Sequence, residues 1–534
     1  MAGEVPQYDL IIIGGGINGA GIARDAAMRG IHTLLLEAND FGSGTSSWSS
    51  RLIHGGLRYL EYGELPLVYE SLHERRHLQS IAAHLVKRIR ITIPIYKGGK
   101  RGRLIVRLGM IAYDLLSLGK NLPGHTMLSR EELIKAEPGI NSKGLRGGSQ
   151  YYDAQVTYAE RLVLENVIAA AEAGAIVRNY SPVTDIQFRD DGNHRVEYTE
   201  AGNADETRAA TAPVIVNAAG PWVDRVLALG NEKMPRLMGG TKGSHIIVAP
   251  FPGAPKDAIY VEAHADGRPI FIIPWNKQYL IGTTDIRVDI DPADVQASDD
   301  EIRYLVDETN RVFPQANLNP QSIHFAYAGV RPLPYKKKGP ESAVTRKHII
   351  KKHRGRARGL ISIIGGKLTT YRNLARQTVD KVQKMGGGHP SVCRTAELPL
   401  PGAIDLEAAE EALASIDALS AEGRHRIAMI YGGRARRLQE LVTAQPGLGA
   451  TLDAEGTVLV AEITLAVRDE FALNLSDIIH RRLMIGLSAD LGAHLTLSIA
   501  AAAAAELGWS SEEAERQLGN LNAHNARLRR TESS

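Results

Sequence analysis

An amino-terminal strand, a glycine-rich turn and a helix limit the possible folds more than any other feature of this chain. Residues 8–13 form a short apolar run typical of a buried parallel strand, and an alanine-rich helical pattern ends near Gly30. A second apolar run, residues 31–36, ends at Glu37. The turn between strand and helix consists of Gly14, Gly15, Gly16, Ile17, Asn18 and Gly19. This order predicts the βαβ unit of an α/β fold with a Rossmann-like domain.

The glycine spacing suits a dinucleotide. In G-x-G-x-x-G the first glycine makes the tight turn, the second lets a pyrophosphate approach the backbone, and the third lets the helix pack on the strand. The helix N-terminus offers free N–H groups and a positive dipole to phosphates. Glu37 falls where a carboxylate accepts hydrogen bonds from ribose hydroxyls, and no arginine follows it to bind a 2′-phosphate. We therefore expect NAD or FAD here, rather than a glycine-rich turn without a ligand.

Two later segments favour FAD over NAD. Residues 214–222 and residues 359–369 each indicate a buried strand that runs into a turn of small residues. We expect a helix to start directly after the second glycine pair, with Lys367 at its N-terminus. Lys367 there could face the pyrimidine edge of a flavin, where negative charge develops on reduction. Taken singly, each segment also fits an ordinary strand-to-helix connection. The small residues of the two turns are Ala219, Gly220, Gly365 and Gly366.

Length and composition indicate a multidomain globular protein. The 534 residues predict roughly three to four domains, and 44% hydrophobic with 23% charged residues excludes a disordered chain, a collagen or a coiled coil. The one cysteine, Cys393, allows neither an intrachain disulfide nor a thiolate metal cluster. No apolar run reaches the ~18 residues of a membrane span, and the charged first thirty residues do not resemble a signal peptide. We expect a cytoplasmic protein, or one bound to a membrane from that side.

The positive charge is unevenly distributed. The net charge of +3 and the 5% aromatic residues argue against nucleic acid as a partner. Residues 75–113, however, contain ten lysines and arginines and no acidic residue, with apolar side chains between them. Such a segment can lie on an anionic membrane surface, or it can be the solvated face of an ordinary domain. Both interpretations remain open from the sequence.

Five further motifs occur in order within the first 375 residues. They are Ser49–Leu60, Lys242–His245, Ile281–Asp285, Ala328–Leu333 and Gly365–Tyr371. Together with the glycine-rich unit they resemble the signature of FAD-dependent, quinone-linked glycerol-3-phosphate dehydrogenases. One departure is Arg51, where that family commonly has lysine, so that the charge is kept while the donor geometry changes.

The resemblance implies a particular architecture. It predicts a flavin domain of the glutathione-reductase and D-amino-acid-oxidase type, an α+β cap over the substrate, and a helical C-terminal domain. Within the cap, residues 266–285 indicate a hairpin-like pair of strands. The expected ranges are 1–70, 150–230 and 325–395 for the FAD-binding domain, 71–149 and 231–324 for the cap, and 396–534 for the C-terminal domain.

The resemblance also implies an activity and partners. The expected reaction is oxidation of sn-glycerol 3-phosphate to dihydroxyacetone phosphate, with hydride transfer from C2 to FAD and electrons passed to membrane quinone. An oxidase that reduces oxygen is the alternative, but the insertion usual in that branch is not evident. A related amine or amino-acid oxidase and a non-enzymatic basic module are weaker alternatives. The implied location is the inner face of the cell membrane, on an anionic surface, and a homodimer remains open.

The substrate is a dianion that must lose a proton and a hydride, so its site needs cations and a base. His245 is the expected base, since a neutral imidazole titrates near working pH. The expected catalytic residues are His245, Arg331, Lys367 and His54, with Arg331 at the developing C2 oxyanion. The expected substrate-binding residues are Arg58, Tyr59 and Arg346. The implied cofactor residues are Gly14, Gly15, Gly16, Asn18, Gly19, Glu37, Thr45, Ser46, Ser50, Ala219, Gly220, Gly365, Gly366, Leu368 and Thr369.

One metal-like motif is set aside. His73 and His77 match H-E-x-x-H, which on a helix places two imidazoles on one face. The two arginines inside the motif raise the positive charge there, and no third ligand follows at a suitable spacing. We expect a charged helix face and no metal site.

Overall fold

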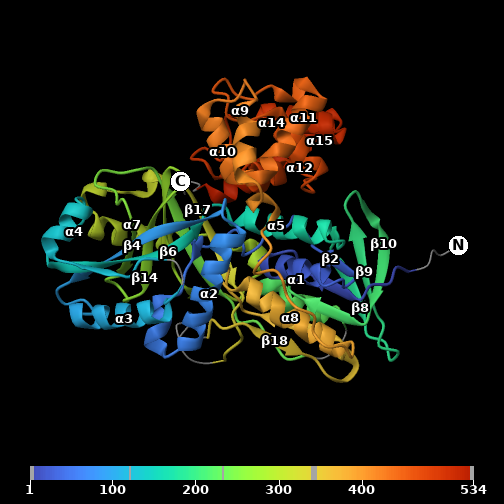
Figure 1. Ribbon diagram of the computed structural model, residues 1–534, viewed down its shortest axis with the longest axis horizontal. Helices are drawn as coiled ribbons and strands as arrows, with labels where there is room; N and C mark the ends of the chain where they lie inside the picture. The colour runs from blue at the N-terminus through green and yellow to red at the C-terminus, as the bar shows by residue number, and fades with distance from the viewer. Residues whose placement is uncertain (1–4, 120–121, 231–233, 338–344, 530–534) are drawn as a thin grey trace.

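The computed structural model contains two large sheets and a separate helical domain (Figure 1). It describes residues 5–119, 122–230, 234–337 and 345–529, with the side chains of residues 58, 62 and 203–205 outside the description. Among these residues, none of the helices combines the length and the apolar character needed to cross a membrane.

The first sheet has six strands in the order β18-β19-β11-β1-β2-β7. Strand β1 is parallel to both of its neighbours, β11 and β2, and only β18 runs antiparallel to its partner. This confirms the strand, helix and strand expected at the amino terminus. The strands are β1 (Leu10–Ile13), β2 (Thr33–Leu36), β7 (Ile176–Arg178), β11 (Val214–Asn217), β18 (Ile349–Lys352) and β19 (Leu360–Ile364).

Both faces of this sheet are covered. Alternate residues of a strand point to opposite faces, so Leu10 and Ile12 pack with helices while Ile11 and Ile13 pack with a three-stranded sheet. All four side chains are buried, as a parallel sheet requires. The helices are α1 (Ile17–Met28), α5 (Ala159–Glu172) and α8 (Tyr371–Met385). The three-stranded sheet contains β8 (Val183–Gln187), β9 (His194–Glu200) and β10 (Asn203–Ala212), and α6 (Val223–Ala228) follows β11.

The second sheet has ten strands and forms the cap. Its strands β14 and β15 are antiparallel neighbours, which confirms the strand pair expected within residues 266–285. Helix α3 packs on one face, and α4 and α7 pack on the other (Figure 1). The strands are β3 (Leu52–Ile53), β4 (Val86–Tyr96), β5 (Thr126–Leu128), β6 (Leu145–Val156), β12 (Thr241–Val248), β13 (Ala258–Glu262), β14 (Pro269–Trp275), β15 (Gln278–Gly282), β16 (Ile286–Arg287) and β17 (Ile323–Arg331). The helices are α2 (Leu65–Ile81), α3 (Arg103–Leu116), α4 (Arg130–Ala136) and α7 (Asp299–Val312).

The strand pairing qualifies the expected domain ranges. Residues 52–53, 150–156 and 325–331 fall in ranges expected for the FAD-binding domain, yet they pair with cap strands. These segments therefore join the two sheets. They also carry side chains of the cavity that lies between them.

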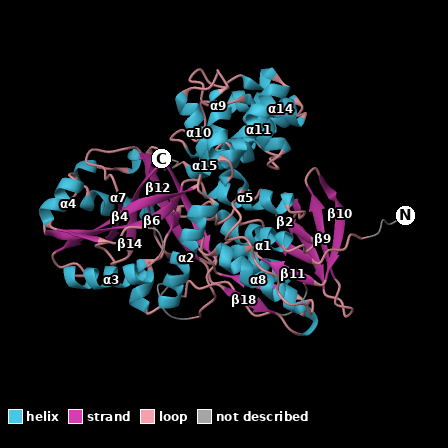
Figure 2. Cartoon of the chain, in the orientation of Figure 1, coloured by secondary structure: helices cyan, strands magenta, loops and turns pink. Residues whose placement is uncertain are grey.

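The described residues of the C-terminal domain form helices and loops (Figure 2), in agreement with the sequence. The expected N-cap Ser510 accepts a hydrogen bond from the backbone N–H of Glu513 at 3.1 Å. The helices are α9 (Leu406–Ala414), α10 (Ala421–Tyr431), α11 (Ala435–Ala444), α12 (Val460–Arg468), α13 (Leu475–Asp477), α14 (Thr496–Leu507) and α15 (Ser511–Leu528).

Buried ion pairs join this domain to the sheets. Glu470 binds Arg161 of α5 at 2.6 Å, and Asp40, which follows β2, binds Arg482 at 2.7 Å. Burial by itself would raise the pKa of Asp40, but Arg482 and Arg481 lower it to about 2. A buried charge that loses its partner costs several kcal/mol. The pairs therefore specify one docking position for the C-terminal domain.

Candidate active site

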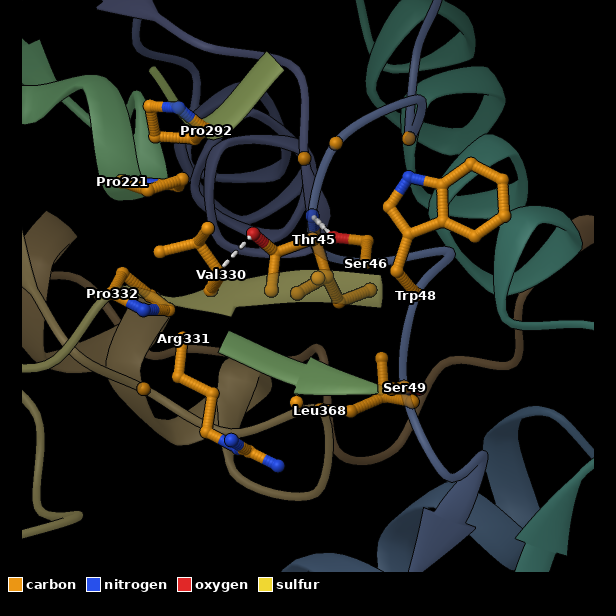
Figure 3. A pocket seen from close by; sticks show the side chains of 18 of the residues that line it. Thr45, Ser46, Trp48, Ser49, Pro221, Pro292, Val330, Arg331, Pro332 and Leu368 are labelled. Carbon is orange, nitrogen blue, oxygen red and sulfur yellow. Dashed lines mark hydrogen bonds between the residues drawn. The ribbon is translucent and has the colours of Figure 1, made fainter. Parts of the chain in front are cut away.

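A cavity of about 1390 Å³ extends between the two sheets and collects most of the predicted residues. Figure 3 shows its middle, where side chains of the loop after β2 meet those of β17. Three predicted cofactor residues, Gly15, Gly19 and Gly365, lie behind its surface. Arg58 belongs to the 3₁₀ helix η1 (Leu57–Tyr62), but its side chain lies outside the described part of the chain.

Among the three glycines of the G-x-G-x-x-G motif, only the second, Gly16, leaves space for a ligand. A Cβ on Gly14 would lie 2.7 Å from the carbonyl oxygen of Ala218, and one on Gly19 would lie 1.8 Å from that of Gly14. Gly14 also has a φ of +107°, which favours glycine. A Cβ on Gly16 would meet only the Ser46 hydroxyl, at 3.3 Å. The turn is thus tight against the protein at Gly14 and Gly19 and open to the cavity at Gly16, as a pyrophosphate requires.

Glu37 holds this turn from the end of β2. One of its carboxylate oxygens accepts the N–H of Gly15 at 2.6 Å, and the other accepts the N–H of Asn39 at 2.8 Å. Burial raises the pKa of Glu37, while these two backbone donors oppose the rise. Each oxygen keeps a lone pair, and Glu37 lines the cavity, so that it can still accept ribose hydroxyls.

The loop after β2 is tied to both sides of the cavity by hydroxyl groups. Ser46 Oγ accepts the N–H of Ile17 at the start of α1 at 3.0 Å. Thr45 Oγ1 donates to the carbonyl of Val330 in β17 at 2.7 Å (Figure 3). These bonds explain why the loop carries hydroxyl side chains at two successive positions.

The second cofactor turn differs from the expectation in one respect. Helix α8 begins at Tyr371, so Lys367 lies in a turn four residues before the helix rather than at its start. Its ammonium lies 3.7 Å from the centre of the Tyr59 ring, in cation–π contact. Burial lowers the pKa of Lys367. In the same turn, Thr369 Oγ1 accepts the N–H of His54 at 3.2 Å and links this turn to the substrate end.

His245 projects from β12 and is 2% exposed. Its Nε2 lies 2.8 Å from Ser50 Oγ, and its ring stacks on Tyr327 with the centroids 5.0 Å apart. Burial, together with Arg331, lowers the pKa of His245 to about 3. Burial likewise lowers the pKa of His54 to about 4. Both imidazoles are therefore neutral at working pH and can accept a proton. The pKa of His245 nevertheless lies well below working pH, and not near it as the sequence suggested, because the ring is buried beside Arg331.

Three arginines converge on Asp285 beside His245. Arg331 contacts one carboxylate oxygen at 3.0 Å, Arg346 contacts the other at 3.2 Å, and Arg268 lies 3.8 Å from it. Burial by itself would raise the pKa of Asp285, but Arg331 and Arg346 lower it. Arg268 is also paired with Asp266 at 3.2 Å, so two carboxylates face the three cations and one positive charge remains. The remaining positive charge makes this end of the cavity suited to a small anion.

Arg268 and Asp285 are functional candidates that the sequence did not assign. Asp285 is the last residue of the motif Ile281–Asp285, so the sequence did contain a signal by which it could have been assigned to the site. Arg268 belongs to no motif and reaches the site because β14, which begins at Pro269, lies next to β15. Arg51, the departure from the family, is fully buried and forms a bidentate pair with Glu160 at 2.7 Å.

Residues 73–77 lie on α2, and Glu74 within them pairs with Arg372. Within the described ranges, no cluster of three or more His, Cys, Asp or Glu residues could hold a metal ion. The pairing with Arg372 accounts for the carboxylate of the H-E-x-x-H sequence.

The chain was compared with known proteins. A model of FAD-dependent oxidoreductases matches residues 9–372, and a model of the C-terminal domain of alpha-glycerophosphate oxidase matches residues 393–514. A glycerol-3-phosphate dehydrogenase of Synechocystis is 45% identical over 96% of this chain and 95% of its own length. A D-erythritol 1-phosphate dehydrogenase of Brucella abortus is 38% identical over 90% of this chain and 94% of its own length.

Solved structures agree. The glycerol-3-phosphate dehydrogenase from Bacillus halodurans, complexed with FAD, has a TM-score of 0.79 and 28% identity, covering 99% of this chain and 96% of that chain. The L-alpha-glycerophosphate oxidase from Mycoplasma pneumoniae has a TM-score of 0.57 at 17% identity, covers 74% of this chain and 99% of its own, and shows the fold alone. These matches confirm the expected fold and FAD as cofactor. This chain belongs to the family of FAD-dependent glycerol-3-phosphate dehydrogenases.

Proposed function

We propose that the enzyme oxidises sn-glycerol 3-phosphate to dihydroxyacetone phosphate. The observation that carries this proposal is the group of three arginines at Asp285, which keeps an excess positive charge after Arg268 pairs with Asp266, next to a neutral buried histidine in the cavity that also contains the dinucleotide turn. The phosphate of a phosphomonoester supplies the negative charge that balances this excess. A polyol without phosphate would leave the excess unpaired.

Each residue then has a role. Arg346, with Arg268 and Tyr59, binds the phosphate, and Arg58 is assigned there from its motif. Arg331 stabilises the developing C2 oxyanion, because its guanidinium stays charged even though burial lowers its pKa to about 10. His245 accepts the hydroxyl proton, and Ser50 holds its ring. Bound FAD supplies the hydride acceptor.

Anaerobic flavin reduction tests the substrate. Glycerol 3-phosphate should bleach the visible flavin bands of the purified enzyme, and glycerol at the same concentration should not. D-erythritol 1-phosphate is the informative competitor, because a relative carries that name. Faster bleaching by D-erythritol 1-phosphate than by glycerol 3-phosphate would contradict the proposed substrate. Hydrogen peroxide formed in air at the rate of dye reduction would favour the oxidase alternative.

We further propose that the electrons pass to membrane quinone and that α3 rests on an anionic membrane surface. Quinone dissolves in lipid, so its reductase must reach the bilayer. Helix α3 carries two apolar faces: Val106, Met110 and Tyr113 are buried in the cap, while the opposite side is exposed to solvent. The exposed apolar residues are Leu104, Ile105, Leu108, Ile111 and Leu115, at 41–70% of their full exposure. Such a face, with arginines beside it, is typical of an interfacial helix.

Fewer cations of the basic segment 75–113 are available for contact with a membrane than its sequence suggests. Arg75 is buried against Asp153 at 2.5 Å, and Arg90 binds Asp257 at 2.7 Å. Arg101 is paired with Glu61 and Glu262. These three arginines stabilise the cap and are poor targets for a binding test. The exposed cations that remain on and just before α3 are Arg103 and Arg107 on the helix itself, and Lys97 and Lys100 in the segment that precedes it.

Vesicle flotation tests the membrane proposal. Replacing Leu104, Leu108 and Leu115 by Gln should lower binding to anionic vesicles at least tenfold, since each exposed Leu that enters the membrane contributes about 1 kcal/mol or more. Turnover with long-chain quinone should fall in parallel, and turnover with a soluble dye should not change. The matched control replaces Val392 and Leu497, which are 80% and 73% exposed elsewhere. Equal flotation of both variants would contradict α3 as the contact.

A further inference from the structure

The C-terminal domain reaches the cofactor cavity at two places. Ser476 and Arg481 line it near Asn39 and Asp40, at the end where Glu37 lies. The carboxyl-terminal end of α15 lines it near the loop that carries Thr45 and Ser46, through His524, Arg527 and Leu528. Neither place belongs to a motif found in the sequence. The cavity therefore has a third wall besides the two sheets.

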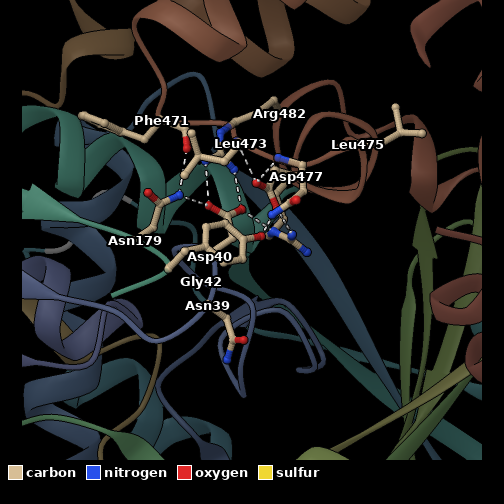
Figure 4. A network of polar contacts seen from close by, with 12 residues as sticks. Asn39, Asp40, Gly42, Asn179, Phe471, Leu473, Leu475, Asp477 and Arg482 are labelled. Carbon is tan, nitrogen blue, oxygen red and sulfur yellow. Dashed lines mark hydrogen bonds and ion pairs between the residues drawn. The ribbon is translucent and has the colours of Figure 1, made fainter. Parts of the chain in front are cut away.

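The first place is rigid. Arg481 donates to Asp40 at 2.5 Å and to Asp477 at 2.6 Å, and Tyr180 donates to the same oxygen of Asp477 at 2.6 Å. Figure 4 shows the surroundings of this network, in which Asp40 of the loop after β2 lies beside Asp477 and Arg482 of the C-terminal domain. Arg481 is only 8% exposed. Its guanidinium is thus held at the cavity by bonds that exist without any ligand.

The second place closes the cavity from outside. Arg527 donates to the backbone carbonyl of Ala293 at 2.5 Å, and Ala293 belongs to a 3₁₀ turn that lines the cavity. His524 lies beside Trp48, with ring centroids 6.4 Å apart. Its Nε2 is buried and has no hydrogen-bond partner among the described residues. A buried polar atom without a partner costs about 1–3 kcal/mol. A hydrogen bond from His524 Nε2 to a ligand in the cavity would remove this cost.

We propose that the C-terminal domain forms part of the FAD site. Arg481, which Asp40 and Asp477 neutralise, forms the wall at the end where Glu37 lies. Arg527 adds a cation to a cavity whose glycine turn offers a diphosphate mainly backbone N–H groups, and His524 supplies a hydrogen bond to the cofactor. The contact of Arg527 with Ala293 must break before FAD can leave on this side. The domain thus retains the cofactor, and its removal from the wall should speed FAD loss without altering the substrate end.

The release rate of FAD from the holoenzyme tests this proposal. Arg527→Gln and His524→Phe should each speed the appearance of free flavin fluorescence at least about threefold, the size expected for one partly exposed contact. The matched control is Arg516→Gln, on the same helix, where Arg516 binds only Glu513. With FAD in excess, kcat/KM for glycerol 3-phosphate should stay within twofold of wild type. Release rates of both variants equal to the control would overturn the proposal.

Amide hydrogen exchange supplies a test without substitutions. FAD should slow exchange at residues 520–528 and 476–482 relative to enzyme stripped of flavin, because a ligand suppresses the local opening of what it contacts. Helices α9 and α11, far from the cavity wall, serve as the internal reference. Equal exchange at residues 520–528 with and without FAD would overturn the role of α15.

Discussion

The two ends of the cavity are built in different ways. The dinucleotide turn at the cofactor end comes from one continuous stretch, β1 to β2, and its contacts are made by the backbone, by missing Cβ atoms and by the Glu37 carboxylate. The substrate end collects charged side chains from β12, the segments next to β14 and β15, β17 and residue 346. The first end recognises a shape common to many dinucleotides. The second, in the function proposed, recognises the charge of a small anion.

This difference predicts how each end fails. A backbone cradle is damaged when atoms are added, because the added group occupies the space of the ligand. A charged site is damaged when atoms are removed, because a buried partner is left uncompensated. Substitutions at the two ends should therefore separate loss of FAD from loss of turnover.

The largest effect is expected at Gly16. Gly16→Val adds a branched side chain where only the Ser46 hydroxyl lies nearby, in the proposed path of the pyrophosphate. The variant should purify with less than a tenth of the wild-type flavin absorbance and with a folded circular dichroism spectrum. The control is Gly447→Val, since a Cβ at Gly447 meets nothing within 4 Å and lies outside the cavity. A folded Gly16→Val enzyme with full flavin absorbance would show that this turn does not hold the cofactor.

A smaller effect is expected at the substrate end. Arg331→Ala should lower kcat/KM for glycerol 3-phosphate at least tenfold, about 1.4 kcal/mol or more, and leave flavin content unchanged. The preference for glycerol 3-phosphate over glycerol should shrink with it. Arg303→Ala on α7 is the control, because Arg303 is exposed and pairs with Asp300. If Arg331→Ala loses flavin along with activity, the two ends are not separable in the way proposed.

The smallest effect is expected from pH. His245 is the proposed base, and it works in the neutral form that exists above its pKa, which burial and Arg331 lower to about 3. At saturating substrate, kcat with a soluble dye should therefore change less than twofold as pH falls from 8 to about 5.5. Glu470, whose pKa Arg161 and Arg434 lower to about 2 against the effect of burial, stays charged in this range and keeps the domains joined.

An acid limb with an apparent pKa near 6.5 would contradict this prediction if it persists when substrate saturates the enzyme at every pH. That condition is needed because the phosphate of the substrate itself has its second pKa at about 6. The control is His494→Gln, since His494 is an exposed histidine that contacts Asp490 outside the cavity. Its pH profile should match that of the wild type.

Local features of the chain were predictable because their physics is local. The βαβ unit, the strand pair of the cap, the N-cap at Ser510 and the dinucleotide turn each depend on residues within about thirty positions of one another. The prediction for Lys367 was less accurate, because the helix start expected at Lys367 lies four residues before the observed start of α8 at Tyr371. The threonines of this turn, Thr369 and Thr370, are as typical of a helix start as of a turn, so the sequence alone did not show where the turn ends and the helix begins.

The sequence by itself determined the FAD turn, the class of the fold and the residue types of the substrate site, because each is encoded by spacing or by a motif. Only the tertiary structure decided that Arg268 joins Arg331 and Arg346 at Asp285, that Arg101 is paired, and that α15 closes the cavity. Those contacts join residues far apart in the chain. Which residues meet in these contacts depends on strand pairing and on buried ion pairs between domains, and neither can be predicted from a local sequence pattern.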